Sequence, residues 1–144
     1  MARIKIPLPE YFPFHTDITV RITDANYAGH LGNDSVFSLT HEARERFLRS
    51  MDFREDDVDG VGIIMNDAAV MYRSEAFPGE VLRVEVAVGE MHRKGCDVLY
   101  RFSCVEDGRE VARVKTGIVF FDFSTRRMVA TPQAFLDAVR AHRD

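Results

Sequence analysis

Hydrophobic and polar residues alternate along the segment that begins at residue 12. Apolar side chains occupy even positions, at Phe12, Phe14, Ile18, Val20 and Ile22. The odd positions 19, 21 and 23 are polar. A period of two is typical of a strand with one buried face. The pattern therefore predicts a half-buried strand that runs up to residue 23.

The next segment has the period of a helix. Its apolar residues share one broad face, at Val36, Phe37, Leu39, Ala43, Phe47, Leu48 and Met51. Either Asn33 or Asp34 can cap the start of this helix. Arg44 projects into the apolar face. An unpaired buried guanidinium is costly, so we expect Arg44 to find a carboxylate or several carbonyl partners.

Four strand patterns follow the helix and are separated by turn signals. They lie near residues 63–74, 82–88, 98–104 and 111–123. Thr131-Pro132 then opens a short C-terminal helix. Strands joined by tight turns form an antiparallel sheet, and such a sheet has one apolar face to cover. The order of patterns predicts an α+β fold in which an antiparallel five-stranded sheet wraps around one long central helix.

Length and composition narrow the classes of function. The 144 residues correspond to a single domain, residues 1–144. A net charge of −4 argues against a general nucleic-acid-binding surface. No apolar run approaches the roughly 20 residues of a membrane span, and the N-terminus lacks the apolar core of a secretory signal. We therefore expect a cytoplasmic protein with no membrane or nucleic-acid partner.

The two cysteines, Cys96 and Cys104, fall on one expected strand, eight residues apart. An extended strand separates them by roughly 26 Å, well beyond the ~7 Å between Cα atoms that a disulfide spans. We expect both to be reduced core residues. Two cysteines without clustered partners also predict that the chain has no structural metal site.

Candidate chemistry is concentrated between the first strand and the helix, in the segment that we call the Asp24–Asn33 loop. It reads Asp24-Ala25-Asn26-Tyr27-Ala28-Gly29-His30-Leu31-Gly32-Asn33. Its side chains can move protons and orient water, and its glycines let the backbone approach a ligand closely. The loop ends where a helix begins, and a helix start offers unpaired N–H groups and positive potential to an anion.

The loop resembles the motif of hotdog-fold acyl-CoA thioesterases of the 4-hydroxybenzoyl-CoA thioesterase-like class. Members carry Asp-x-Asp-x-x-Gly-(His/Ile)-x-x-Asn before the central helix, and this chain has Asp24-x-Asn26-x-x-Gly29-His30-x-x-Asn33. The helix also matches, as Glu42-Ala43-Arg44-x-x-Phe47-Leu48. The resemblance implies the hotdog fold and hydrolysis of an acyl-CoA thioester, with no cofactor beyond the coenzyme A of the substrate. In relatives two subunits join their sheets edge to edge, which implies a homodimer or homotetramer with sites between subunits.

One position departs from the motif. In the best-characterised branch the second acidic residue attacks the thioester or activates water, and here that position holds Asn26. An amide can be neither a carboxylate nucleophile nor a general base near pH 7. Plant acyl-carrier-protein thioesterases place Asp, Asn and His along the same loop, and only His30 is retained in type. The carrier, coenzyme A or acyl-carrier protein, is therefore left open.

Thioester hydrolysis needs donors for the developing oxyanion and a positioned water with a base. We expect backbone amides around Gly29 and Gly32 to supply the donors. His30 is the expected base or acid, because an imidazole exchanges protons near neutral pH. Asn26 or Asn33 could hold the water. The alternative interpretations are that His30 is a turn residue and that Asn33 is only a helix cap.

Several carboxylates and cations complete the candidate set. Asp24 could orient His30 or pair with Arg44. Asp67 and Glu75, on the strand after the helix, are reserve carboxylates. The turn Glu90-Met91-His92-Arg93-Lys94-Gly95 resembles the basic turn that lies near the nucleotide end of coenzyme A in relatives, so Arg93 and Lys94 are expected to bind it. The alternative is a solvated hairpin tip.

Two functions remain open at this point. The first is hydrolysis of an acyl-CoA thioester by water, aided by the Asp24–Asn33 loop and the helix start. The second is a module that binds acyl-CoA without cleaving it, because Asn26 replaces the usual acid. A Ser-His-Asp hydrolase is disfavoured, since the chain has no Gly-x-Ser-x-Gly elbow.

Overall fold

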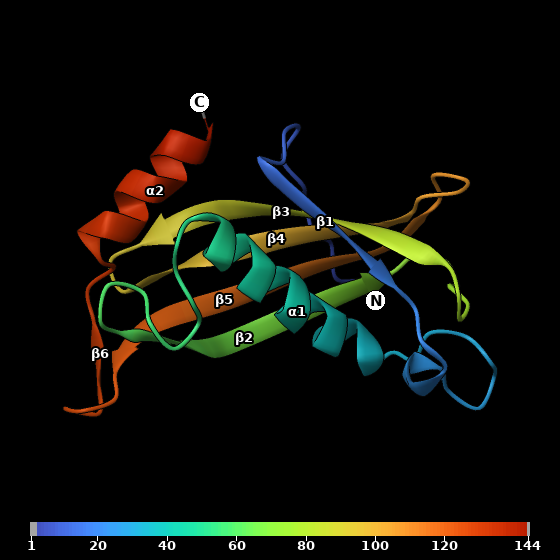
Figure 1. The fold of residues 1–144 in the computed structure, drawn as a ribbon, viewed down its shortest axis with the longest axis horizontal. Coiled ribbons are helices and arrows are strands. Elements are labelled where there is room, and N and C mark those ends of the chain that lie inside the picture. Colours follow the sequence, from blue (N-terminus) through green and yellow to red (C-terminus); the bar gives the residue numbers. More distant parts are fainter. Residues whose placement is uncertain (1–2, 144) are drawn as a thin grey trace.

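One antiparallel sheet, crossed by a long helix, organises the chain (Figure 1). The computed structural model describes residues 3–143. The elements are β1 (Phe14–Thr19), the 3-10 turn η1 (Ile22–Asp24), α1 (Ser35–Ser50), β2 (Gly62–Tyr72), β3 (Val81–His92), β4 (Gly95–Cys104), β5 (Glu110–Asp122), β6 (Arg127–Val129) and α2 (Gln133–Arg143). Neither helix in this part of the chain is long and apolar enough to cross a membrane.

The sheet has the order β1-β3-β4-β5-β2, and β6 pairs with β5. It therefore contains six strands rather than the expected five. The sixth, β6, is three residues long, which is too short to show a period in the sequence. β2 lies at one end of the order, with a bulge between Met65 and Asp67. Its outer edge has no strand partner within residues 3–143.

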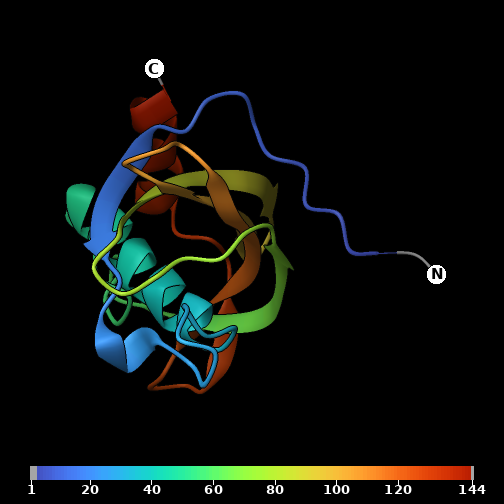
Figure 2. The same cartoon turned by 90° about the vertical axis from the view of Figure 1, so that its right-hand side faces the viewer.

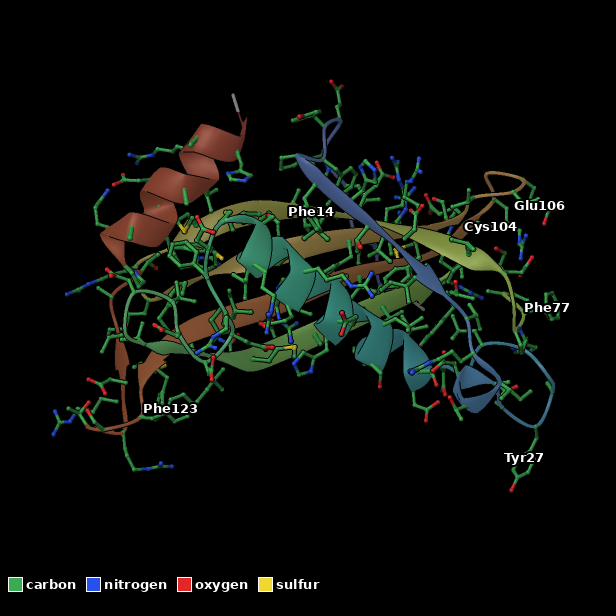
Figure 3. The ribbon with its side chains drawn as sticks, viewed as in Figure 1. Phe14, Tyr27, Phe77, Cys104, Glu106 and Phe123 are labelled. Carbon is green, nitrogen blue, oxygen red and sulfur yellow. The ribbon has the colours of Figure 1, made fainter. Side chains whose placement is uncertain are left out.

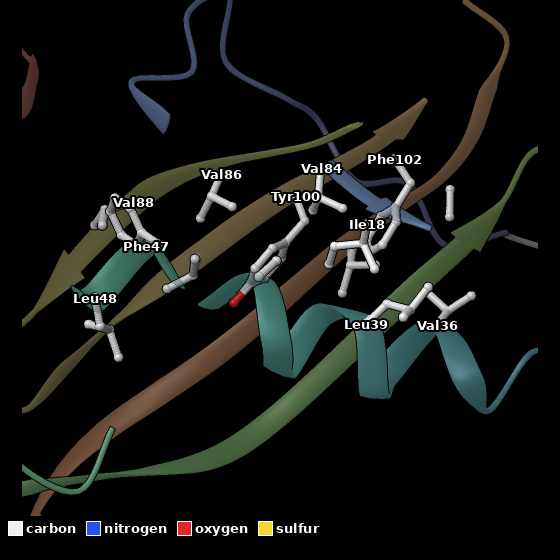
Figure 4. Packing of buried hydrophobic residues seen from close by; sticks show 14 of the residues in the cluster. Ile18, Val36, Leu39, Phe47, Leu48, Val84, Val86, Val88, Tyr100 and Phe102 are labelled. Carbon is white, nitrogen blue, oxygen red and sulfur yellow. The ribbon is translucent and has the colours of Figure 1, made fainter. Parts of the chain in front are cut away.

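The core lies between α1 and the concave face of the sheet, which curls around the helix (Figure 2). Val36, Leu39, Ala43, Phe47 and Leu48 of α1 are buried, as their spacing predicted. Figure 4 shows the apolar side chains of β3 and β4 facing this helix, with the Tyr100 hydroxyl among them. Phe37 was expected on the same apolar face, but it is 41% exposed because it lies at the margin of the buried stripe.

The first strand is shorter than its alternation predicted. β1 ends at Thr19, and residues 22–24 form the η1 turn instead of continuing the strand. The carboxylate of Asp24 accepts a hydrogen bond from the Arg21 amide at 2.8 Å, which bends the chain. Ile22 is consequently exposed although its position in the pattern is apolar.

The C-terminal helix α2 closes one end of the fold. It begins directly after Pro132, as the Thr131-Pro132 pair predicted. Phe135 is fully buried and packs on Phe120 of β5, with ring centroids 5.1 Å apart. α1 is therefore the central helix, and α2 caps the sheet at the end opposite the Asp24–Asn33 loop (Figure 1).

Both cysteines lie on β4 and are buried as free thiols, as predicted. Burial, and to a smaller extent the charge of Asp97, raises the pKa of the Cys96 thiol to about 12. A thiol in this state is a poor nucleophile near neutral pH. Cys96 is therefore part of the core packing.

Candidate functional site

Backbone hydrogen bonds hold the Asp24–Asn33 loop in a compact shape. The amide of Asn26 donates to the His30 carbonyl at 2.9 Å, and the amide of Gly29 donates to the Asn26 carbonyl at 3.0 Å. Gly29 has a φ of 80°, which favours glycine. The amide of Leu31 donates to the carbonyl of Ala76 at 2.7 Å, so the loop is fixed to the segment that follows β2.

Asp24 has a structural role in this loop. It is 5% exposed, and its carboxylate accepts hydrogen bonds from the Arg21 amide and, at 3.5 Å, from Arg21 Nε. Within residues 3–143 it bonds to neither His30 nor Arg44, the two partners that the sequence allowed. These bonds hold Asp24 at the η1 turn, at the entry to the loop.

Arg44 finds the carboxylate that its buried position requires, and that carboxylate is Glu55. Arg44 Nη2 and Nε lie 2.8 and 3.2 Å from Glu55 Oε1, and Nη1 lies 3.5 Å from the Tyr100 hydroxyl. Burial alone lowers the pKa of a guanidinium, but Tyr100 and Glu55 outweigh that effect and raise the pKa of Arg44. Arg44 is 1% exposed and remains charged, so the prediction of a paired arginine is confirmed.

A cleft of about 460 Å³ opens where the Asp24–Asn33 loop meets α1 and the end of β2. We call it the His30 cleft. It is lined by Asn26, His30, Leu31, Asn33, Val36, Tyr72, Arg73, Ser74, Glu75, Ala76, Val111 and Ala112. Its volume lies within the ordinary range of small-molecule sites. Figure 3 shows Phe77 at the same end of the molecule and Tyr27 at the outer tip of the loop.

His30 is oriented by its neighbours in this cleft. Its Nδ1 lies 3.3 Å from the Leu31 carbonyl, which only accepts, so Nδ1 carries the hydrogen in this arrangement. Nε2 lies 4.0 Å from Glu75 Oε1 and is left as the proton-exchanging atom. The ring stands edge-on to Phe77, with centroids 6.4 Å apart. Of the candidate carboxylates, Glu75 is the one that the structure places beside His30.

The two glycine amides that the sequence singled out are already hydrogen-bonded within the loop. The amide of Gly29 donates to Asn26, and the amide of Gly32 donates to the Asp24 carbonyl at 2.9 Å, so neither glycine amide is available. Within residues 3–143, the amides of His30, Asn33 and Val36 have no hydrogen-bond partner. All three residues line the His30 cleft. The glycine amides are used within the loop, and the unpaired amides belong to residues that line the cleft.

The start of α1 is left open in the described chain. Asp34 is the N-cap residue, and its side chain makes no capping hydrogen bond. Asn33 Oδ1 accepts from the adjacent Asp34 amide at 2.8 Å, so neither predicted cap covers the first turn of the helix. Unpaired N–H groups at a helix start carry positive potential. The cleft therefore presents a region suited to a partial negative charge.

Two further side chains of the cleft are hydrogen-bond donors. Asn26 Oδ1 accepts from the Ala28 amide at 3.0 Å in an Asx turn, so its NH₂ group remains free to donate. Tyr72 donates its hydroxyl hydrogen to the Asn33 carbonyl at 2.9 Å. Burial and the charge of Asp34 raise the pKa of Tyr72, which keeps the hydroxyl protonated.

The remaining predicted residues lie away from the His30 cleft. Asp67 lies on β2 near Lys115, with 3.5 Å between Oδ2 and Nζ, and it lines a different cleft. Arg93 and Lys94 form the exposed turn between β3 and β4. The Lys94 carbonyl accepts a hydrogen bond from the amide of Phe120 on β5. Phe120 is nine residues along β5 from Val111, which lines the His30 cleft. That separation corresponds to roughly 30 Å of strand.

The structure adds a pair that the sequence did not reveal. His41 Nε2 lies 2.6 Å from Glu55 Oε2, and both residues line a second cleft of about 570 Å³, which we call the His41 cleft. Glu55 lies in the loop between α1 and β2, where no periodicity marks it. The available signal was Arg44, whose buried charge required a carboxylate from outside the helix.

A cluster of potential metal ligands lies outside the His30 cleft, on β3 and β4. In the described part of the chain, the ligand atoms of Glu90, His92 and Asp97 lie within 4.8 Å of one another. Asp97 Oδ1 also lies 3.8 Å from the Lys115 ammonium, which competes with a cation for the same oxygen. The cluster does not border the His30 cleft.

Residues 20–139 match the sequence profile of the thioesterase-like superfamily. The chain belongs to this superfamily. No curated protein matches the chain significantly.

Solved structures show the same hotdog fold as this thioesterase-like protein. Slr0204, a 1,4-dihydroxy-2-naphthoyl-CoA thioesterase from Synechocystis, is 22% identical with a TM-score of 0.80, over 88% of this chain and 95% of that one. BH1999, a gentisyl-coenzyme A thioesterase, is 16% identical with a TM-score of 0.78, over 88% and 99%. SAV2348 from Staphylococcus aureus, in complex with CoA, is 16% identical with a TM-score of 0.81, over 96% and 87%.

Proposed function

We propose that this thioesterase-like protein hydrolyses an acyl-CoA thioester to the free acid and coenzyme A. The observation that carries the proposal is the His30 cleft, where a histidine and three unpaired amides meet at an uncapped helix start. The superfamily supports thioester hydrolysis in general. The structural neighbours named above act on acyl-CoA or contain CoA, which favours coenzyme A over an acyl-carrier protein.

The residues of the cleft fit the steps of the reaction. The thioester carbonyl oxygen accepts hydrogen bonds from the amides of His30, Asn33 and Val36, and these bonds strengthen as the oxygen becomes an oxyanion. The positive end of α1 adds to the same effect. Water loses a proton to solvent as its oxygen bonds to the acyl carbon, the carbon–sulfur bond breaks, and the departing sulfur takes a proton from Nε2 of a His30 ring that carries hydrogen on both nitrogens and is reloaded from solvent. The NH₂ group of Asn26 orients the carbonyl or the water.

The function also involves a second copy of the chain. Within residues 3–143 the outer edge of β2 has no strand partner, and exposed edges are covered or paired in stable proteins. Ile64, Met65 and Tyr72 on this strand are 36%, 41% and 55% exposed. We infer a homodimer at least, in which two β2 strands pair antiparallel and the sheets become continuous. Paired dimers would form a tetramer.

A dimer of this kind also bears on Arg93 and Lys94. Their turn lies at the end of the sheet where β2 begins, and the His30 cleft lies at the end where β2 stops. Antiparallel pairing of two β2 strands brings the turn of one copy to the same end as the cleft of its partner. Arg93 and Lys94 then bind the phosphates of a coenzyme A held in the partner's cleft.

The test is release of free thiol from short-chain, medium-chain and aromatic acyl-CoAs, detected with a chromogenic disulfide. Both cysteines are buried, which keeps the protein's own signal low. We expect hydrolysis of at least one class, and loss of about 10²-fold or more in kcat for His30→Ala. The exposed His15 on β1 supplies the matched control, since His15→Gln leaves both clefts intact. Absence of turnover with every substrate would contradict the proposal.

The second candidate is an acyl-CoA-binding module without turnover. The observation in its favour is Asn26, whose amide cannot replace the acid of the motif. Calorimetry that shows tight binding of an acyl-CoA without release of thiol would support the module. If His30→Ala abolishes a measurable rate and leaves binding intact, the module is excluded.

A further inference from the structure

The pair formed by His41 and Glu55 has the geometry of an oriented proton acceptor. His41 Nε2 lies 2.6 Å from Glu55 Oε2. A carboxylate only accepts, so Nε2 carries the hydrogen and Nδ1 of the neutral ring keeps its lone pair. The His41 side chain is 63% exposed, which leaves the ring accessible from the His41 cleft.

Glu55 is held rigidly enough to orient the imidazole. Its second oxygen, Oε1, bonds to the buried Arg44. Its backbone amide donates to Glu45 Oε1, and its carbonyl accepts from the Ile63 amide, both at 2.9 Å. The pair between His92 and Asp97 is looser, at 3.3 Å, and Asp97 is shared with a lysine. Only the His41 pair combines a short contact with a buried cationic anchor among the carboxylate–histidine contacts of residues 3–143.

The other charged groups around His41 are paired among themselves. From α1, Glu42 bonds to Arg46 at 2.7 Å and Glu45 bonds to Arg49 at 2.8 Å. From the loop before β2, Arg54 lies 3.4 Å from Asp56. Glu55 is therefore the charge that faces the imidazole at hydrogen-bond distance, and His41 is the proton-exchanging side chain of this cleft.

His41 does not serve the His30 cleft of its own chain. It lies eight residues along the helix from Asn33, which corresponds to about 12 Å of rise. Two contacts locate the start of α1 and the region of Arg44 relative to β2. The Tyr72 hydroxyl bonds to the Asn33 carbonyl near the end of the strand, and Met65 Sδ lies 4.0 Å from Arg44 Nη1 in its first half.

In a dimer with two-fold symmetry, His41 can lie close to the His30 cleft of the other copy. When two β2 strands pair antiparallel, the end of one strand lies beside the first half of the other. The Tyr72 and Asn33 end of one copy then lies beside Met65 and Arg44 of its partner, and therefore beside the His41–Glu55 pair. Phe37 precedes His41 by one helical turn on the same face, and its exposed ring adds apolar surface to this contact.

We propose that His41, oriented by Glu55, is the general base that activates water for the thioester bound in the His30 cleft of the partner copy. The inference rests on the proposed function and supplies the base that Asn26 cannot provide. His41 Nδ1 takes a proton from water as the water oxygen bonds to the acyl carbon. The carbon–sulfur bond then breaks, and the sulfur takes its proton from Nε2 of the partner's His30, which enters the step with hydrogen on both ring nitrogens. Solvent restores both imidazoles.

The test compares His41→Gln with His15→Gln, which removes an exposed histidine of β1 that lines neither the His30 cleft nor the His41 cleft. We expect His41→Gln to lower kcat by about 10²-fold or more. We expect Glu55→Gln to lower kcat less, because the imidazole remains but loses its orientation, while His15→Gln keeps wild-type kinetics. A His41→Gln rate within about twofold of wild type overturns the proposal.

Mixed dimers decide whether His41 acts across the interface. His30→Ala and His41→Gln chains are each inactive alone, but a mixed dimer has one cleft with both histidines intact. After subunit exchange at equal amounts, half of the dimers are mixed and half of their clefts are complete, so activity returns to about a quarter of wild type. No recovery after verified exchange overturns the arrangement between subunits. Wild-type protein without any hydrolysis removes the proposed function itself.

Discussion

A single charge inside the hydrophobic layer fixes a segment eleven residues further along the chain. Arg44 lies on the apolar face of α1 and bonds to Glu55, which belongs to the loop before β2. Tyr100 and Thr116 continue this polar network across the concave face of the sheet, with 3.2 Å between their hydroxyl oxygens. The position of Glu55 therefore follows from the cost of leaving Arg44 unpaired.

The first prediction concerns this network. Glu55→Ala leaves a buried guanidinium without its carboxylate, so we expect the free energy of unfolding to fall by about 3 kcal/mol. Arg44→Met removes the charge and keeps most of the volume, so a loss within about 1.5 kcal/mol is expected. Urea unfolding followed by circular dichroism measures both. Equal losses for the two variants would show that the ion pair does not set the stability of this layer.

The second prediction concerns Glu45. Burial alone raises the pKa of this carboxyl, but hydrogen bonds from Arg49 and the Glu55 amide lower it overall. A folded-state pKa below the unfolded value stabilises the fold at neutral pH, and this stability is lost as the pH falls through the folded pKa. Glu45→Gln should therefore flatten the acid side of the stability curve. An unchanged slope between wild type and variant, measured by urea unfolding at several pH values, would contradict it.

At the scale of the elements, periodic segments were predictable from the sequence and short aperiodic ones were not. The spacing of Val36, Leu39 and Phe47 placed α1, because burial of one face leaves a repeat in the chain. β6 and η1 are three residues each and leave no repeat. Asp34 occupies the predicted N-cap position of α1, but its side chain makes no capping hydrogen bond, and Asn33 bonds to the adjacent amide instead of to the first turn.

The third prediction tests the hairpin that joins β3 and β4. Gly95 begins β4, and a Cβ there would collide with the carbonyl oxygen of Ile118 on β5. A backbone atom of a central strand cannot move away cheaply, so Gly95→Ala should lower the free energy of unfolding by roughly 2–3 kcal/mol. Gly108→Ala serves as a comparison, because its surroundings are open and only its φ of 75° opposes a side chain. Thermal unfolding of both variants measures which substitution lowers the stability of the fold more.

At the scale of the whole molecule, the sequence indicated the loop that lines the candidate cleft but not the contacts within it. The loop, its histidine and the helix start could be predicted because motif residues lie close together in the chain. The available amides, the proximity of Glu75 and the pair of His41 with Glu55 depend on contacts between segments distant in sequence. Gly29 illustrates the difference. A glycine at this position predicts a turn, and Gly29 has a positive φ, but the sequence did not reveal that its amide donates to the Asn26 carbonyl.

The fourth prediction tests the assembly. We expect light scattering at micromolar concentration to give at least twice the 16.4 kDa chain mass. Ile64→Lys places a charge on the exposed edge of β2, where the same charge from the partner opposes pairing. The variant should shift toward a monomer and lose thiol release, while its circular dichroism stays native. A monomeric wild type, or a monomeric variant with full activity, would contradict sites shared between subunits.

The Asx turn at Asn26 has one more implication, for how such a protein can change its reaction. Only the Oδ1 atom of Asn26 accepts the Ala28 amide, and an aspartate offers an equivalent oxygen. The loop can therefore exchange an amide for an acid at this position without refolding. A single substitution between Asn and Asp can therefore remove or restore the carboxylate of this loop. The reaction can continue after its removal, provided that a neighbouring subunit supplies a base close to the cleft.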